Sequence, residues 1–343
     1  MSINRNFSDG LNYLSKFNFS RLNNAAKIWL TFHLSKLTKK VSIQGMPISL
    51  AIEPTTSCNL RCPECPSGLR SFTRPTGMLE LGTFNKIIDE LAPTLTYLTL
   101  YFQGEPYLHP QFLDLVRKAT TNNIYTATST NAHYLTKGKA IETVQSGLDR
   151  IIISIDGTTQ ETYEQYRIGG VLDKVLEGTK NLIEAKNELK SKTPYVVFQF
   201  LVVKPNEHQI EEAKELAKNM GVDELGFKTA QIYDYKDGND LIPSNDKFSR
   251  YRKNKKGKYE LKRTAPLSSC WKMWHSAVMT WDGGVVPCCF DKDSQHEMGN
   301  IAKLSFKDIW LGRSYTNFRR ALLDSRKHIS MCENCTEGTK VYD

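Results

Sequence analysis

Three cysteines in one short segment, Cys58, Cys62 and Cys65, have the spacing CxxxCxxC. Three thiolates on one loop can bind three irons of a cubane iron–sulfur cluster and leave the fourth iron without a protein ligand. An iron with an open position can bind a small molecule and pass it an electron. A structural zinc site usually combines CxxC pairs with a fourth ligand nearby. The spacing therefore favours a redox-active iron–sulfur cluster over zinc.

A second group of cysteines lies near the end of the chain: Cys270, Cys288, Cys289, Cys332 and Cys335. Residues 277–286 contain an Asp-Gly-Gly turn and predict a β-hairpin that brings Cys270 beside Cys288. Helices predicted at 306–310 and 315–323 would return the CxxC of Cys332 and Cys335 to the same point. Neighbouring residues on a strand face opposite ways, so we expect Cys288 to be a ligand and Cys289 to be spare. These four cysteines would serve a second iron–sulfur cluster or a zinc ribbon equally well.

Between the two cysteine groups the chain alternates between short β-branched runs and amphipathic segments. Six strands are predicted, at 49–53, 95–102, 125–129, 150–155, 195–203 and 224–228. Helices are predicted at 84–91, 112–120, 137–146, 171–189 and 210–220. Repeated strand–helix units imply a parallel sheet with right-handed crossovers. The predicted fold class is therefore α/β, an open partial (β/α)6 barrel with a small C-terminal cluster-binding module.

Polar motifs follow the predicted strands, at the end of the sheet where such folds place their chemistry. The cysteine loop follows the first strand, and Gly104-Glu105-Pro106, Ser129-Thr130-Asn131 and Ser154-Ile155-Asp156 follow later ones. In this order they resemble the motifs of the radical S-adenosylmethionine (SAM) superfamily, with Gln103 replacing the usual first glycine. The resemblance implies that SAM binds the open iron and contacts Gly104, Glu105, Asn131, Ser154, Asp156 and Arg167. Each motif taken alone is also common in ordinary turns or in surface salt bridges.

The C-terminal cysteines resemble the SPASM/twitch extension of that superfamily, and four ligands suffice for one auxiliary cluster. The resemblance implies as cofactors a SAM-binding 4Fe–4S cluster, an auxiliary 4Fe–4S cluster and SAM, with cluster ligands Cys58, Cys62, Cys65, Cys270, Cys288, Cys332 and Cys335. It also implies a flavodoxin or ferredoxin-type electron donor. We expect a helical extension at 1–48, the barrel at 49–231, a bridge at 232–266 and the auxiliary-cluster domain at 267–343.

Composition and charge limit the other partners. The 343 residues are 40% hydrophobic and 24% charged, without an apolar run long enough to span a bilayer or an N-terminal signal sequence. We therefore expect a cytoplasmic protein, whose clustered thiols bind metal. The net charge of +9 includes a basic run at 250–258, interpreted as a solvated loop because no nucleic-acid-binding motif accompanies it. A helix predicted at 21–40 could lie on an anionic membrane surface, but we favour a helix that covers an edge or the bottom of the barrel.

The expected reaction is hydrogen abstraction from a substrate carbon by a 5′-deoxyadenosyl radical. An auxiliary cluster with four protein ligands could accept an electron, which favours two-electron oxidation of a small alcohol or sugar. Peptide maturation, by oxidising or cross-linking side chains, is an alternative, as is a non-catalytic zinc-binding adaptor. Substrate specificity is expected at the ends of the fifth and sixth strands and in the 232–266 bridge. No catalytic base and no substrate is assigned from sequence.

Overall fold

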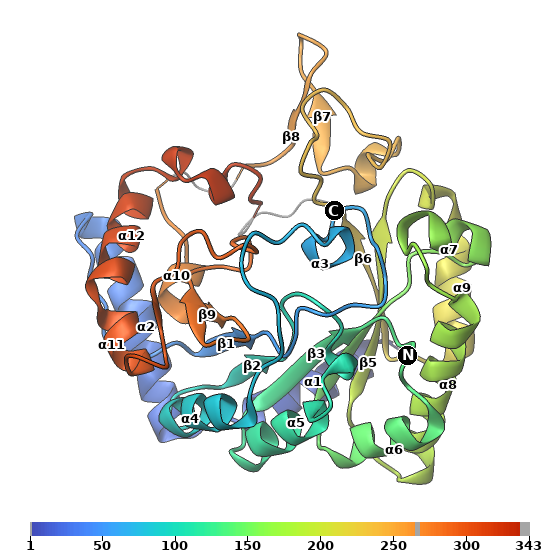
Figure 1. Ribbon diagram of the computed structural model, residues 1–343, viewed down its shortest axis with the longest axis horizontal. Coiled ribbons are helices and arrows are strands. Elements are labelled where there is room, and N and C mark those ends of the chain that lie inside the picture. Colours follow the sequence, from blue (N-terminus) through green and yellow to red (C-terminus); the bar gives the residue numbers. More distant parts are fainter. Residues whose placement is uncertain (1, 265–267, 337–343) are drawn as a thin grey trace.

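A computed structural model describes residues 2–264 and 268–336 of the chain. Its centre is one nine-stranded sheet with the order β11-β10-β9-β1-β2-β3-β4-β5-β6 (Figure 1). The six predicted barrel strands are present, and each is parallel to its neighbours among the six. They are β1 Ser49–Ile52, β2 Tyr97–Thr99, β3 Tyr125–Thr130, β4 Arg150–Ser154, β5 Tyr195–Val202 and β6 Glu224–Thr229. The partial α/β barrel is therefore confirmed, although β2 is shorter than the predicted 95–102.

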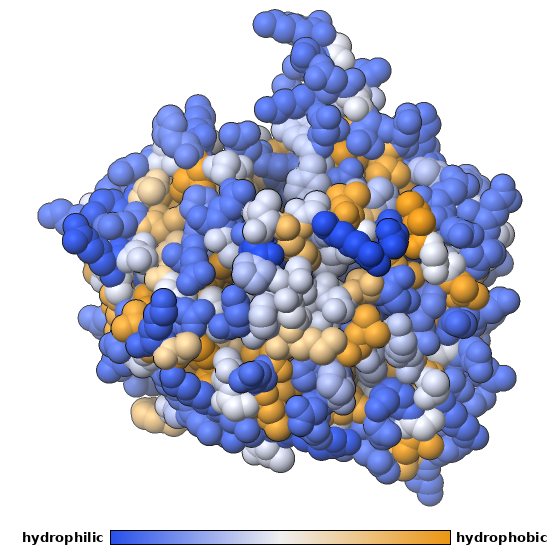
Figure 2. Space-filling model, in the orientation of Figure 1, coloured by the Kyte–Doolittle hydropathy of each residue, from blue (hydrophilic) through white to orange (hydrophobic). Residues whose placement is uncertain are grey.

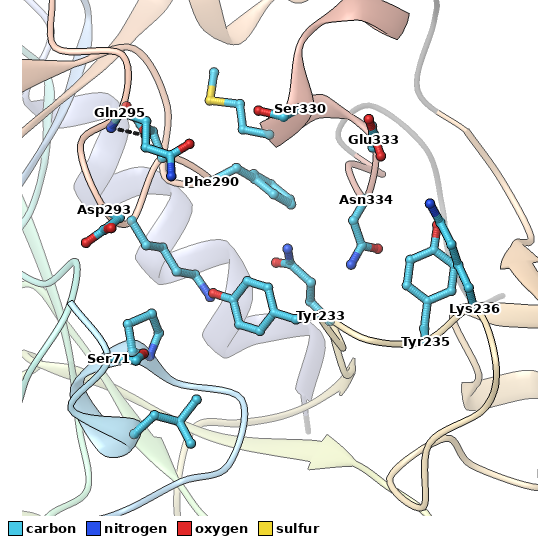
Figure 3. A pocket seen from close by; sticks show the side chains of 16 residues that line it. Ser71, Tyr233, Tyr235, Lys236, Phe290, Asp293, Gln295, Ser330, Glu333 and Asn334 are labelled. Atoms are coloured by element: carbon cyan, nitrogen blue, oxygen red, sulfur yellow. Dashed lines mark hydrogen bonds between the residues drawn. The ribbon is translucent and has the colours of Figure 1, made fainter. Parts of the chain in front are cut away.

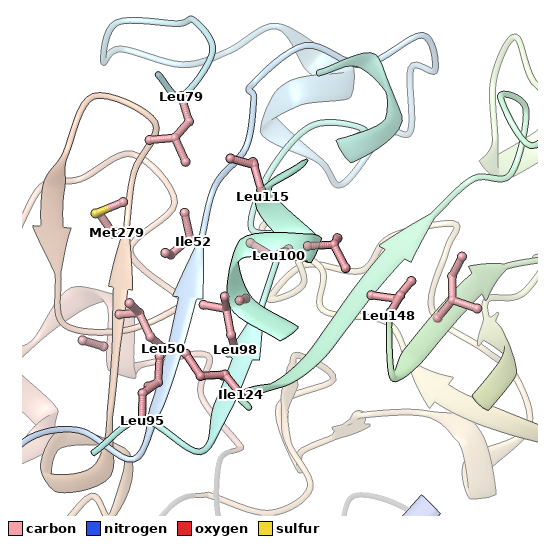
Figure 4. Close-up of a cluster of buried hydrophobic side chains, with 14 of the residues drawn as sticks. Leu50, Ile52, Leu79, Leu95, Leu98, Leu100, Leu115, Ile124, Leu148 and Met279 are labelled. Carbon is pink, nitrogen blue, oxygen red and sulfur yellow. The ribbon is translucent and has the colours of Figure 1, made fainter. Parts of the chain in front are cut away.

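Helices cover the outer side of this curved sheet (Figure 1). They are α4 Leu81–Leu91, α5 Phe112–Thr121, α6 Lys137–Gln145, α7 Gln160–Tyr166, α8 Leu172–Glu188 and α9 Ile210–Met220. The short α7 was not predicted, and neither were the one-turn helix α3 Pro66–Leu69 and the 3-10 turns η1 Pro106–Leu108 and η2 Glu207–Gln209. Leu50, Ile52, Leu98 and Leu100 of the sheet region are completely buried in the core (Figure 4). Burying side chains of this size stabilises the fold by roughly 1.5–3 kcal/mol each.

The C-terminal module continues the barrel sheet. The predicted hairpin is present as β9 Ser276–Met279 and β10 Gly284–Val286, followed by the short β11 Gly299–Asn300. Strand β9 pairs in parallel with β1 along its whole length, from Ser49↔Ser276 to Ile52↔Met279. The remaining elements of the module are α10 Lys272–His275, α11 Phe306–Leu311, α12 Arg313–Asp324, η4 Arg326–His328 and η5 Ser330–Cys332. The β1 edge of the barrel is thus covered by β9 and not by an N-terminal helix.

Two N-terminal helices, α1 Ser2–Ser15 and α2 Phe19–Thr38, reach the bottom of the barrel, where the strands begin. Helix α2 continues onto α10 of the module, where the ring of Phe32 lies 5.0 and 5.4 Å from those of Trp271 and Trp274. Arg21 at the start of α2 donates hydrogen bonds to four carbonyl oxygens, including those of Ala92, Asn122 and Asn123 before β2 and β3. Asp9 of α1 pairs with Arg150 at the start of β4. The expected cover over the bottom is therefore present, but α1 was not foreseen.

The bridge between barrel and module contains regular secondary structure that was not predicted from the sequence. It contains η3 Asp246–Phe248 and a hairpin of β7 Tyr251–Lys253 and β8 Tyr259–Leu261. The hairpin projects from the body of the molecule and is strongly hydrophilic (Figures 1 and 2). Part of the basic run at 250–258 forms β7, so the interpretation as a loop was wrong for residues 251–253, whereas residues 254–258 form the turn of the hairpin. The pairing of these strands was not predicted because each is only three residues long and together they contain three charged residues, which have weak strand propensity.

Candidate functional site

The first cysteine group follows β1 and surrounds the one-turn helix α3. Cys65 precedes this helix, and its backbone N–H donates to the carbonyl oxygen of Cys62. The N–H of Leu60 lies 3.5 Å from the Cys58 sulfur. Burial raises the pKa of the Cys58 thiol to about 12, and the nearby Glu105, Cys62 and Cys65 add to that rise. The three sulfurs of the loop therefore lie close enough together for Cys62 and Cys65 to raise the pKa of Cys58.

Gly104 brings the second motif against the cysteine loop. Its φ of +74° favours glycine, and a Cβ there would lie 2.3 Å from the carbonyl oxygen of Thr55. Its N–H donates to the Ser67 hydroxyl at 2.9 Å, which fixes the contact. Gln103, the departure from the family motif, places its Oε1 3.8 Å from the Cys65 sulfur. The replacement therefore puts an amide beside a predicted cluster ligand.

Glu105 is buried beneath this contact and is well supplied with donors. Its carboxylate accepts hydrogen bonds from the Thr130 hydroxyl, at 2.7 Å, and from the N–H groups of Asn131 and Tyr107. Burial raises its pKa, whereas these three donors act in the opposite direction. The Asn131 amide in turn donates to Asn59 of the cysteine loop at 2.8 Å. Glu105 and Asn131 thus connect the end of β3 to the segment that carries the cysteines.

Asp156 and Arg167 form a buried pair beside Cys62. The Arg167 Nε donates to the Asp156 carboxylate at 2.5 Å, and its Nη1 lies 3.7 Å from the Cys62 sulfur. The other Asp156 oxygen accepts from the N–H of Leu201 on β5. Burial raises the pKa of Asp156, and Arg167 opposes the rise. Ser154, at the end of β4, is also buried. Five of the six residues expected near SAM therefore follow or end strands β2, β3 and β4, and the sixth, Arg167, lies at the C-terminal end of α7.

The second cysteine group meets at one cavity in the C-terminal module. Cys270, Cys288, Cys332 and Cys335 all line it, together with Arg326, whose Nη2 lies 3.1 Å from the Cys335 sulfur. Burial raises the pKa of Cys270 and of Cys332, and Arg326 opposes both shifts. Among the residues that the structure describes, those of both cysteine groups included, no three His, Cys, Asp or Glu side chains stand close enough together to hold a single metal ion.

Cys289 does not line this cavity. The Lys272 ammonium lies 3.6 Å from its sulfur instead. The reason we gave for its exclusion was wrong, because β10 ends at Val286 and both Cys288 and Cys289 lie in the following turn. Strand alternation therefore does not apply to this pair.

A larger cavity of about 600 Å³ is lined by residues that neighbour both cysteine groups in the sequence (Figure 3). Pro66 and Leu69, which directly follow the first group, form one wall. Tyr233 and Lys236 of the predicted bridge form another. The module contributes two segments to the lining, which include Phe290, Asp293, Gln295, Met331 and Glu333. Phe290 and Met331 also line the four-cysteine cavity, so the two spaces share a wall.

Two arginines near the cysteines belong to no recognisable motif and were not predicted from the sequence. Arg326 reaches the second group through η4, fifty-six residues after Cys270. Arg74 binds Glu53 through two hydrogen bonds of 2.6 and 2.9 Å, and Glu53 also accepts from the N–H of Trp281. This pair ties the end of β1 to the loop after the cysteines and to the β9–β10 turn. Only its position directly before the cysteine loop could have drawn attention to Glu53.

Comparisons with known proteins agree with this geometry. A family model for the radical SAM superfamily matches residues 52–217, and one for the SPASM iron–sulfur cluster-binding domain matches residues 270–336. The tungsten-containing aldehyde ferredoxin oxidoreductase cofactor-modifying protein of Pyrococcus furiosus is 28% identical over 79% of this chain and 82% of its own length. PqqA peptide cyclase of Gluconobacter oxydans is also 28% identical, over 61% of this chain and 57% of its own length.

Among solved structures, Streptococcus suis SuiB bound to S-adenosylmethionine is similar with a TM-score of 0.62. The likeness covers 84% of this chain and 71% of that chain at 16% identity, so it concerns the fold.

Proposed function

Because the chain belongs to the radical SAM superfamily and carries a SPASM domain, we propose that it oxidises a small hydroxylated substrate held between its two cysteine groups. SAM and 4Fe–4S clusters are its cofactors. The observation that carries the proposal is the cavity of about 600 Å³, which is bounded by the loop after Cys65 and shares Phe290 and Met331 with the four-cysteine cavity. A substrate there would lie between the site of radical formation and an electron acceptor.

Residues of this chain would hold the cofactors as follows. Cys58, Cys62 and Cys65 would bind the first cluster, which supplies the electron that cleaves SAM to a 5′-deoxyadenosyl radical. Gly104 leaves room for close backbone approach, and Glu105, Asn131, Ser154, Asp156 and Arg167 would form the SAM site. Cys270, Cys288, Cys332 and Cys335 would bind the auxiliary cluster, a one-electron acceptor. A reduced flavodoxin or ferredoxin would supply electrons to the enzyme.

The proposed reaction balances as a two-electron oxidation. A hydrogen atom would leave the carbinol carbon to give 5′-deoxyadenosine. The hydroxyl would lose its proton and the remaining electron would go to the auxiliary acceptor, which leaves a carbonyl. The lining supports a polar substrate of sugar size, because Lys236, Gln295 and Glu333 offer charges and hydrogen bonds from three segments. Cavities of this size usually enclose a small ligand.

Peptide maturation is the second candidate, and the similarity to PqqA peptide cyclase favours it. A peptide segment would enter the same cavity, and the product would be an oxidised or cross-linked side chain. Untargeted comparison of metabolites and peptides from a deletion strain separates the candidates. A small alcohol that accumulates supports the first, and an unmodified peptide that accumulates supports the second.

The test of the radical chemistry is reductive SAM cleavage by the anaerobically reconstituted protein. We expect 5′-deoxyadenosine from the wild type with dithionite and none from the triple variant Cys58→Ala/Cys62→Ala/Cys65→Ala. If the triple variant still cleaves SAM, the assignment of the first cluster is wrong.

The auxiliary site has a matched pair of variants in adjacent residues. Wild type should bind about eight irons, four per cubane, and Cys289→Ala should keep that number. Cys288→Ala should lose iron and destabilise the module, since a cluster that binds the folded state adds to its stability. The opposite behaviour of the two variants would make Cys289 the ligand. About four irons with one zinc would refute the oxidation, because zinc cannot accept an electron.

A further inference from the structure

The second N-terminal helix has its polar and apolar faces reversed relative to an ordinary surface helix. Its buried side chains are mostly polar: Arg21, Asn24, Ile28, Thr31, Phe32 and Ser35. Asn24 and Ser35 hydrogen-bond to the chain at Met46 and Ser42, so this polar face is satisfied by the protein itself. A helix packed on a core normally buries its apolar stripe and exposes its polar one. The packing of α2 on the barrel and on α10 therefore leaves its apolar stripe without a partner in the described part of the chain.

That stripe is continuous along the exposed side of α2. Phe19, Leu22, Trp29, Leu30 and Leu37 are exposed, with Trp29 at 55%, Leu30 at 60% and Leu37 at 83%. At about 100° per residue they fall on one face, roughly opposite the buried one. The first helix repeats the pattern, since Phe7, Leu11 and Leu14 are exposed at a spacing of four and three residues. Half of the exposed large hydrophobic side chains in the described chain lie within residues 7–37, so this surface differs from the rest of the molecule.

Lysines border the stripe on both sides. Lys27 and Lys36 are exposed and lie roughly 90° to either side of its centre by the same helical geometry. Lys39 and Lys40 are exposed at the helix end. Among the described ion pairs none involves these four lysines, whereas Lys16 is paired with Asp149. Residues 1–48 contain seven Lys or Arg and one Asp, and so carry six of the nine net positive charges.

We infer that α2 binds the surface of an anionic phospholipid bilayer. An interfacial helix presents Trp, Phe and Leu to the acyl chains and places lysines at the phosphate level on either side. The charge pattern favours this occupant over a second copy of the chain, because two such faces would bring unpaired lysines together. None of the described helices has the length and apolar character needed to cross a bilayer, so the attachment would be peripheral.

The orientation that follows is set by the barrel. The N-terminal helices contact the beginnings of the strands, through Arg21 and Asp9. The predicted SAM site and the large cavity lie at the opposite, C-terminal strand ends. A protein that rests on a bilayer through α2 would therefore turn the opening of its cavity away from the lipid.

Vesicle sedimentation with the reconstituted full-length protein tests this inference. Vesicles of phosphatidylcholine with about one third phosphatidylglycerol should bind the protein at low salt, and pure phosphatidylcholine should bind it about tenfold or more weakly. The variant Trp29→Ser/Leu30→Ser/Leu37→Ser should lose binding at least about tenfold. The matched control Leu189→Ser/Leu304→Ser/Leu311→Ser removes three exposed leucines elsewhere and should bind like wild type. SAM cleavage should be unchanged in both variants, which shows that they are folded.

Two further measurements make the outcome decisive. Trp29→Phe should keep vesicle binding but reduce the quenching of tryptophan fluorescence by brominated lipid, because Trp29 would lie at acyl depth. Equal binding by the Trp29/Leu30/Leu37 variant and its control would overturn the inference, as would equal binding to neutral and anionic vesicles. If the wild type does not bind vesicles but forms a dimer that the same variant abolishes, the exposed face of α2 binds a second copy of the chain and the membrane assignment is wrong.

Discussion

Replacing Arg74 by methionine should destabilise the protein, because a buried carboxylate would lose its cationic partner. Arg74 and Glu53 are joined by two hydrogen bonds, their side chains are 7% and 0% exposed, and the N–H of Trp281 is the other recorded donor to Glu53. Removing one partner of a buried ion pair costs about 3–5 kcal/mol. We expect the free energy of unfolding of Arg74→Met to fall by about 3 kcal/mol in mildly alkaline buffer.

The loss should depend on pH with a defined sign. Burial raises the pKa of Glu53 above its ordinary value of 4.5, and Arg74 opposes that rise. Without Arg74 the carboxyl of the folded protein takes up a proton more readily. A carboxyl group whose pKa is raised by folding stabilises the folded state at a pH below the pKa of the unfolded state. This stabilisation is lost as the pH rises through the pKa of the folded state. The deficit of Arg74→Met should therefore be smallest near pH 4.5 and grow by up to about 1.4 kcal/mol per pH unit above it.

Urea unfolding followed by tryptophan fluorescence measures this deficit across the pH range. Arg117→Met removes one partner of the exposed pair with Asp114 and serves as control, with an expected change within about 0.5 kcal/mol. The double variant Glu53→Gln/Arg74→Met should recover part of the loss, because no unpaired charge remains. A loss no larger than that of the control, or one that does not vary with pH, would refute the role assigned to this pair.

Three other predictions concern the site. Gly104→Ala should lower the free energy of unfolding by about 3 kcal/mol or more and reduce the iron bound at the first cysteine group, because the new Cβ would clash with the Thr55 carbonyl oxygen. The control Gly221→Ala, with a similar φ but open space around it, should lower the free energy of unfolding by only about 1 kcal/mol. Glu105→Gln should weaken SAM binding about tenfold in equilibrium dialysis, and an unchanged affinity would remove the carboxylate from the SAM site. His133 accepts a hydrogen bond from the N–H of Val171 through Nε2, and burial lowers its pKa below 6.5. Neutral His133 stabilises the folded state above pH 6.5, and this stabilisation is lost as the pH falls through the lowered pKa. The midpoint of urea unfolding should therefore drop in acid for wild type and much less for His133→Gln.

The sequence by itself determined the features that depend on local spacing. The CxxxCxxC run, the alternation of strands and helices and the motifs at strand ends all follow from short-range periodicity and turn chemistry. These patterns were sufficient for the α/β partial barrel. The radical SAM and SPASM assignments rested on the resemblance of the motifs to those families, and the family models confirm them. The hairpin at 276–286 was also predictable, because its Asp-Gly-Gly turn is a local signal.

Only the tertiary structure decided which distant segments meet. No periodicity reports that β9 pairs with β1, that Arg326 reaches the second cysteine group, or that Phe290 and Met331 separate two cavities. The basic hairpin escaped prediction because its pairing overrides weak strand propensity. The orientation of α2 is the clearest case. Its sequence shows an apolar stripe but not its direction, and the fold turned that stripe outward because Arg21, Asn24 and Ser35 satisfy backbone groups of the protein on the opposite face.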